Sequence, residues 1–105
     1  MFSVREKVVV VTGSSGGNGS AISDSLHELG AIVIKADLPK FDITKSSHLD
    51  RLLKHALRYN NNIDGLINCA GVTIGNHLFD YSLNDWDTTY KVNLKAPFEL
   101  SRIVA

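Results

Sequence analysis

Four consecutive valines run directly into a glycine-rich segment, and this junction constrains the fold more than any other feature of the sequence. Residues 8–11 are all valine, and residues 12–19 read TGSSGGNG. A continuous β-branched run is typical of a strand buried on both faces, as in a parallel sheet. We therefore expect a buried strand over residues 8–11, followed by a tight turn and a helix.

The segment after the turn has the residue spacing of a helix. Its apolar residues are Ala21, Ile22, Leu26 and Leu29, and Gly30 follows where a left-handed residue commonly ends a helix. The sequence therefore predicts a helix that begins near residue 19 and ends at residue 30.

Two further helices are predicted downstream. Ser47 and Asp50 have the spacing of an N-terminal capping pair. The helix that they begin presents an apolar stripe made of Leu49, Leu52, Leu53, Ala56 and Leu57. Ser82 and Asp85 repeat the capping spacing before Trp86, so a last helix is expected to begin there and to continue towards the C-terminus.

Residues 31–36 and 63–68 predict two more buried strands between these helices. Alternating strands and helices indicate βαβ units with right-handed crossovers. The expected fold is therefore α/β, a doubly wound parallel sheet of the Rossmann type, with residues 1–105 forming part of one domain. Only four residues separate Asp37 from Asp42, too few for a helical crossover. We expect residues 41–43 to form a short edge strand or an extended loop.

The glycine-rich turn has the position of a dinucleotide site, between a strand and a helix. Residues without Cβ allow a tight turn and a close approach of backbone to a pyrophosphate, and a helix N-terminus favours negative charge. A flexible Gly/Ser loop is the alternative. We assign cofactor contacts in this turn to Gly13, Ser15, Gly17, Asn18 and Gly19. Asn18 either bonds a phosphate or caps the helix.

Asp37 ends the second predicted strand, about 20 residues beyond the glycines, where a carboxylate can accept both hydrogen bonds from an adenosine ribose. A 2′-phosphate would meet like charge there, and the turn carries Gly16 instead of a basic residue. Lys35 and Lys40 are the only cations nearby in the sequence. The predicted cofactor is therefore NAD, in preference to NADP.

Three later motifs extend the glycine-rich pattern. They are Asp42-Ile43, Asn68-Cys69-Ala70-Gly71, and the segment from Trp86 to Asn93-Leu94. In order and spacing, the four motifs resemble the short-chain dehydrogenase/reductase family along essentially the whole chain. The turn alone also fits the extended branch of that family, but the later motifs favour the compact branch. The resemblance implies cofactor contacts from Asp42, Ile43, Asn68, Ala70 and Gly71.

The resemblance also implies a catalytic role for Asn93, whose main-chain carbonyl would hold a water in the family's proton relay. Pro97 lacks an N–H and cannot donate to the carbonyl four residues earlier, which is that of Asn93. We therefore expect a kinked helix there and a water on the freed carbonyl. Packing of Asn93 against the asparagine motif is a compatible alternative.

The family's catalytic serine and Tyr-x-x-x-Lys pair cannot be assigned in this sequence. The residues four positions after Tyr59, Tyr81 and Tyr90 are isoleucine, aspartate and leucine. We therefore expect the chain to be the N-terminal portion of a longer, homo-oligomeric oxidoreductase that moves hydride between NAD and an alcohol or ketone, and to be inactive alone. The alternatives are a non-catalytic dinucleotide-binding module and a fragment without cofactor affinity.

Composition excludes several other kinds of protein. Eleven basic residues balance eleven acidic ones and are scattered, which disfavours nucleic-acid and membrane partners. The apolar runs are too short to span a membrane, and Cys69 has no partner for an internal disulfide, so a cytoplasmic location and a buried thiol are expected. The four histidines are too dispersed for a metal motif: His27, His48, His55 and His77.

Overall fold

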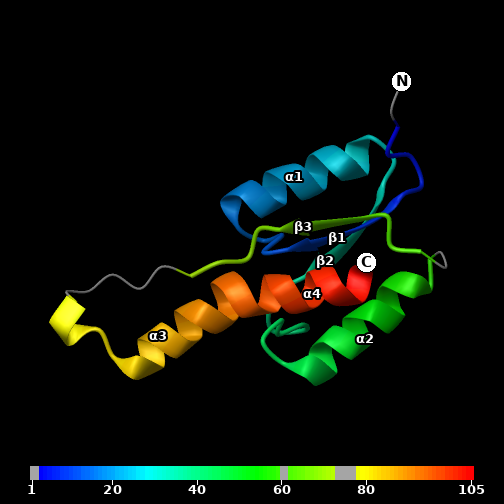
Figure 1. The fold of residues 1–105 in the computed structure, drawn as a ribbon. Coiled ribbons are helices and arrows are strands. Elements are labelled where there is room, and N and C mark those ends of the chain that lie inside the picture. Colours follow the sequence, from blue (N-terminus) through cyan, green and yellow to red (C-terminus); the bar gives the residue numbers. More distant parts are fainter. Residues whose placement is uncertain (1–2, 60–61, 73–77) are drawn as a thin grey trace.

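A computed structural model describes residues 3–59, 62–72 and 78–105 and shows a three-stranded parallel sheet with helices on both faces (Figure 1). The strands pair in the order β2-β1-β3 and are β1 (Val8–Thr12), β2 (Ile32–Ala36) and β3 (Gly65–Asn68). This arrangement confirms the Rossmann-type α/β fold, in which β1 is central and the chain crosses it between β2 and β3.

Helices lie on the two faces of the sheet and beyond one end of it. Helix α1 (Gly17–Glu28) covers one face, and α2 (Ser46–Leu57) and α4 (Ala96–Val104) cover the other (Figure 1). Helix α3 extends away from the sheet and continues into α4 through a π-helical turn. These remaining elements are η1 (Leu78–Asp80), α3 (Leu83–Tyr90) and the π-helical turn η2 (Lys91–Lys95).

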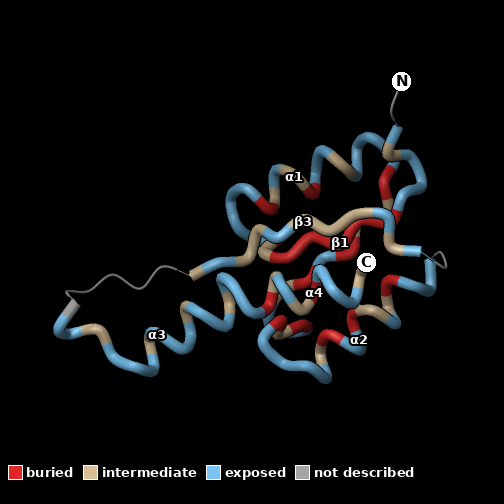
Figure 2. Tube along the Cα trace, in the orientation of Figure 1, coloured by how far each residue is buried: buried red, intermediate tan, exposed pale blue. Residues whose placement is uncertain are grey.

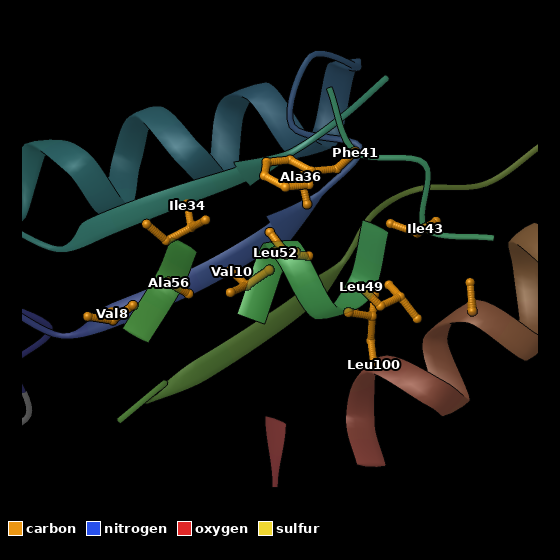
Figure 3. Packing of buried hydrophobic residues seen from close by; sticks show 11 residues of the cluster. Val8, Val10, Ile34, Ala36, Phe41, Ile43, Leu49, Leu52, Ala56 and Leu100 are labelled. Carbon is orange, nitrogen blue, oxygen red and sulfur yellow. The ribbon is translucent and has the colours of Figure 1, made fainter. Parts of the chain in front are cut away.

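The valines of β1 form the centre of the core, as the tube in Figure 2 shows by its continuous buried stretch. Side chains of a strand alternate between its faces, so β1 serves two clusters. Val8 and Val10 pack with the helices of one face, where Leu52 and Leu100 are almost fully buried (Figure 3). Val9 and Val11 pack towards α1 on the other face.

Helix α1 approaches the sheet through a different set of residues from the predicted one. Its inward residues are Gly19, Ile22, Ser23 and Leu26, at helical spacing, whereas Leu29 and Ala21 are exposed. The predicted stripe was therefore wrong at two of four positions. Small residues at 19 and 23 replace large apolar ones because the helix lies close to the strand there.

Helix α2 begins one residue before its predicted cap. Lys45 is the N-cap and makes no side-chain cap hydrogen bond, so the predicted cap at Ser47 was wrong. Leu49, Leu52 and Ala56 are buried as predicted, but Leu57 is exposed.

Helix α3 has the predicted cap, because Ser82 Oγ accepts a hydrogen bond from the Asp85 amide at 3.0 Å.

Residues 41–43 form a loop and not the edge strand that was the other predicted alternative. Strand β2 is less buried than predicted, since Lys35 is exposed.

Strand register brings three segments to one edge of the sheet. Thr12 pairs with Ala36 on β2 and with Asn68 on β3, so the three strands end side by side. The residues that follow them, Asp37 among them, therefore meet at the carboxyl edge. In open α/β sheets, ligands bind at this edge where the strand order reverses.

Candidate functional site

A cleft of about 310 Å³ opens at the carboxyl edge of the sheet, where the glycine-rich turn meets the ends of β2 and β3. Three segments line it: the turn after β1, the loop between β2 and α2, and the chain that follows β3. Their lining residues are Gly13, Ser15, Gly16, Ala36, Asp37, Leu38, Phe41, Asp42, Ile43, Thr44, Cys69, Ala70, Gly71 and Val72, together with Val92.

Two glycines of the turn are required by the fold itself. A Cβ on Gly13 would lie 2.7 Å from the Ala70 nitrogen, and the φ of Gly13 is +62°. A Cβ on Gly19 would lie 1.9 Å from the Gly13 carbonyl oxygen. Since real Cβ atoms do not approach backbone so closely, these glycines allow the turn to close and α1 to pack on β1.

Gly17 differs from these two glycines, because a Cβ built on it would meet nothing within 4 Å. It is the first residue of α1, where free backbone N–H groups and the helix dipole favour an anion. The fold therefore gives no steric reason for glycine at this position.

Asp37 is joined to the glycine-rich turn through Ser14. The Ser14 amide donates to Asp37 Oδ1 at 2.7 Å, and the Ser14 hydroxyl donates to Oδ2. Ser14 is buried and Asp37 is half-buried. An ionised carboxylate has about four acceptor positions, so two remain for other donors.

Thr12 joins the turn to the segment after β3. Its side chain is fully buried, and Oγ1 accepts hydrogen bonds from the Cys69 and Ala70 amides, both at 3.1 Å. The backbone after β3 is thereby fixed against the end of β1. Cys69 lines the cleft and is half-buried, so the expectation of a buried thiol was too strong.

Asn93 makes a reciprocal pair of hydrogen bonds with the backbone of Val72. The Val72 amide donates to Asn93 Oδ1, and Asn93 Nδ2 donates to the Val72 carbonyl, each at 2.8 Å. Asn93 is thus bonded to the residue that directly follows the asparagine motif, against which it was predicted to pack. Asn93 itself lies in η2, where the Ala96 amide donates a hydrogen bond to the Lys91 carbonyl oxygen. Pro97 directly follows Ala96. A π-helical turn thus occupies the position of the predicted irregularity.

The loop between β2 and α2 is organised around Asp42. Its Oδ1 accepts from the Thr44 amide at 3.0 Å and from Thr44 Oγ1 at 2.6 Å. These hydrogen bonds, chiefly that of the Thr44 side chain, hold the pKa of the Asp42 carboxyl below its ordinary value. The Asp42 amide donates to His48 Nδ1 at 2.9 Å, which links the loop to the first turn of α2.

The predicted site residues divide into two groups. Seven of them line the cleft together: Gly13, Ser15, Asp37, Asp42, Ile43, Ala70 and Gly71. Five lie outside its lining: Gly17, Asn18, Gly19, Asn68 and Asn93. Asn18 is exposed on α1, and Gly16 is the N-cap without a side-chain cap bond, so a capping role for Asn18 was wrong.

Several lining residues carry no motif and were not predicted from the sequence. Leu38, Phe41 and Thr44 come from the loop after β2, and Val72 and Val92 come from later segments. Leu38 follows Asp37 directly, and 72% of it is accessible to solvent, which only the structure shows. Ser14 and Thr12 act through hydrogen bonds that only the folded chain reveals.

Within residues 3–59, 62–72 and 78–105, no group of three or more His, Cys, Asp or Glu side chains is placed to hold a metal ion. His77 lies outside these residues. None of the described helices is both long and apolar enough to cross a bilayer.

The sequence profile of one family, described as short chain dehydrogenase, matches residues 7–105. An uncharacterized oxidoreductase of Staphylococcus epidermidis is 33% identical over an alignment of 113 residues, gaps included. The alignment covers 90% of this chain and 49% of that protein. One of Staphylococcus aureus is 32% identical over 114 residues, with the same coverage. The chain thus spans about half the length of the curated relatives it matches.

A solved structure shows the same fold. The 3-ketoacyl-(acyl-carrier-protein) reductase from Brucella melitensis, complexed with NADH, superimposes with a TM-score of 0.87 and 21% sequence identity. The superposition covers 95% of this chain and 49% of that chain.

Proposed function

Because the chain belongs to the short-chain dehydrogenase family, we propose that it forms the NAD(H)-binding part of an oxidoreductase. The intact protein would transfer hydride between NAD and an alcohol or ketone. Relatives at about one-third identity are named oxidoreductases, and the Brucella reductase of the same fold was solved with NADH.

One observation carries the proposal: Asp37 lines the cleft and is held by Ser14 against the turn that precedes α1. The carboxylate keeps acceptor positions for the two hydroxyls of an adenosine ribose. The nearby N-terminus of α1 provides the N–H groups and positive dipole end that a pyrophosphate needs. The parallel pairing of β1 with β2 brings the Asp37 carboxylate and the N-terminus of α1 to the same edge of the sheet.

The glycine at position 17 fits the same ligand. Open space next to its Cα leaves room for a pyrophosphate to approach the backbone, and Ser15 lines the cleft beside it. We assign the phosphate contacts to Ser15, Gly17 and Asn18, with Gly13 and Gly19 shaping the turn.

The adenine would lie against the loop after β2. Leu38 and Ile43 supply apolar surface in the cleft, and Asp42 supplies polar groups beside them. Across the cleft, Ala70 and Gly71 follow Asn68 and extend the wall towards Val72. We assign the remaining cofactor contacts to these residues, and a positioning role to Asn93, which holds that wall through Val72.

NAD is the proposed form of the cofactor, in preference to NADP. A 2′-phosphate beside the Asp37 carboxylate would be repelled, and Gly16 in the cleft offers no compensating charge. Lys35 is exposed on β2, and the Lys40 ammonium lies 5.4 Å from the centre of the Phe41 ring, over its face.

The nicotinamide, when bound, accepts or supplies the hydride. The residues of this chain bind and orient the cofactor, and the proton donor would belong to the remainder of the intact protein. A non-catalytic dinucleotide-binding module is the second candidate, because none of the tyrosines here is followed by lysine four positions later.

Titration of the chain with NADH, followed by nicotinamide fluorescence, tests the binding proposal. We expect saturable binding of NADH. NAD should displace NADH, and NADP should displace it at least tenfold less well. An absence of saturable binding would contradict the proposal, and equal competition would contradict the preference for NAD. Reductase activity after the chain is joined to the second half of a relative would separate the catalytic from the non-catalytic candidate.

A further inference from the structure

We infer that His48 is a positioning residue for the cofactor, because it holds the loop after β2 in place through the backbone amide of Asp42. The inference rests on the proposed cofactor site. His48 is not among the residues that line the cleft, and no motif points to it.

The geometry fixes the protonation state that this role requires. His48 is the third residue of α2, and its Nδ1 lies 2.9 Å from the Asp42 nitrogen. A backbone N–H can only donate, so Nδ1 must act as the acceptor and the proton of the neutral ring lies on Nε2. The bond therefore exists only while His48 is neutral.

The bonded amide lies at the centre of the cleft-lining loop. Phe41 and Ile43, on either side of Asp42, are 3% and 7% exposed, and all three residues line the cleft. No strand runs through residues 37–45, so sheet pairing does not hold the Asp42 amide. The side chain of His48 is the acceptor that anchors this amide to α2.

Charged groups lie close to the His48 ring on α2 and on the preceding loop. Arg51 Nη2 lies 3.5 Å from Nδ1, and the ring lies in the first turn of α2, near the positive end of the helix dipole. Lys45 adds a further positive charge at the N-cap, and the Asp42 carboxylate interacts electrostatically with both Lys45 and His48. That carboxylate is already bonded to Thr44.

Protonation of His48 changes Nδ1 from an acceptor to a donor. Two donors would then face each other, so the hydrogen bond to the Asp42 amide is lost and the ring turns away from it. The loop that would bind adenine is then less ordered before the cofactor arrives. Loss of one neutral hydrogen bond corresponds to roughly fivefold weaker binding.

The test compares NADH affinity at about pH 8 and about pH 5.5, because protonation of the His48 ring would remove the acceptor at Nδ1. We expect the unmodified chain to bind NADH about fivefold more weakly at the lower pH. In His48→Asn, the amide oxygen can take the place of Nδ1 and accepts at both pH values, so the ratio should approach one. His48→Ala should bind weakly at both.

His27→Asn is the matched control, because His27 is exposed on α1, which does not carry the loop. In His27→Asn, the ratio of NADH affinities at the two pH values should equal that of the unmodified chain. The same pH ratio in His48→Asn and the unmodified chain would overturn the inference. An absence of NADH binding at both pH values would instead contradict the proposed function.

Amide hydrogen exchange of Asp42 provides a readout without cofactor. Exchange should be faster in His48→Ala and unchanged in His48→Asn at about pH 8. Equal Asp42 exchange in the unmodified chain and His48→Ala would overturn the inference whatever the outcome of the NADH titrations.

Discussion

Asp37 accepts two hydrogen bonds from Ser14, one from its amide at 2.7 Å and one from its hydroxyl. The two residues are 23 positions apart, and the parallel pairing of β1 with β2 brings them together. The carboxylate is therefore oriented before any ligand binds, which lowers the entropic cost of binding.

The first prediction concerns cofactor choice. Asp37→Ala removes the acceptors for the ribose hydroxyls and the charge that repels a 2′-phosphate. NADH should bind at least tenfold more weakly, and NADPH should bind as well as or better than before, because hydrogen bonds to charged groups are worth about 1.5–3 kcal/mol each. Fluorescence titration with both cofactors measures the change. An equal loss for NADH and NADPH would contradict this role of Asp37.

A second prediction separates two glycines of one turn. Gly17→Ala should leave the chain as stable as before, or more stable by up to about 1 kcal/mol, because its Cβ would meet open space at the start of α1. It should nevertheless weaken NADH binding, since the added methyl group would occupy the proposed pyrophosphate position.

Gly19→Ala should have the opposite result, with a loss of roughly 3 kcal/mol of stability from the backbone clash with Gly13 O. Urea unfolding and NADH titration of both variants provide the measurements. The prediction fails if Gly17→Ala binds NADH as tightly as the unmodified chain.

A third prediction concerns the amide pair between Asn93 and Val72. Asn93→Ala removes both hydrogen bonds and should lower the free energy of unfolding by about 1–2 kcal/mol. Asn93→Asp is the informative comparison, because it keeps an acceptor for the Val72 amide but turns an oxygen towards the Val72 carbonyl. Both variants should be destabilised in urea unfolding. Full stability of Asn93→Asp would show that the pair is not held as described.

The fourth prediction is a dependence of stability on pH. Partial burial, with help from Lys40 and Arg58, lowers the pKa of His55 from its ordinary value of 6.5. The unfolded chain therefore binds more protons than the folded chain just below pH 6.5, so stability falls as the pH is lowered from there to the folded pKa. Below the folded pKa the contribution of His55 stays constant.

His55→Gln cannot titrate and should show a flatter dependence across this range. Urea unfolding at intervals from about pH 7.5 to about pH 5 measures both curves. Parallel curves for the variant and the unmodified chain would rule out His55 as the source. Asp42 acts in the same direction at lower pH, since its lowered pKa makes its contribution disappear only below the ordinary value of 3.8.

The sequence predicted what depends on local pattern. The valine run, the glycine-rich turn and the cap at Ser82 are each formed by residues close together in the chain, and each occurs in the structure. The position of Asp37 after the second strand, and the family motif that contains Asn93, also identified these two residues. Their physical environments could not be predicted, because the partners Ser14 and Val72 are 23 and 21 residues away.

The errors have the same origin. Ser47 has the right spacing for a cap, but the loop after β2 reaches α2 through His48, and the helix starts at Ser46. The face of α1 was misjudged because close packing on β1 selects Gly19 and Ser23, which a hydrophobic pattern does not identify. In both cases, tertiary contacts override a local preference.

The π-helical turn η2 has a consequence for how this part of the chain tolerates change. One additional residue in a turn rotates everything after it by about 100° around the helix axis. Ala96 and Leu100 are buried against the core only with this rotation in place, while Leu94 on the other side is exposed. Deletion of a single residue from 91–95 would thus leave a regular helix whose exposed side faces the sheet, although no residue of the core itself had been changed.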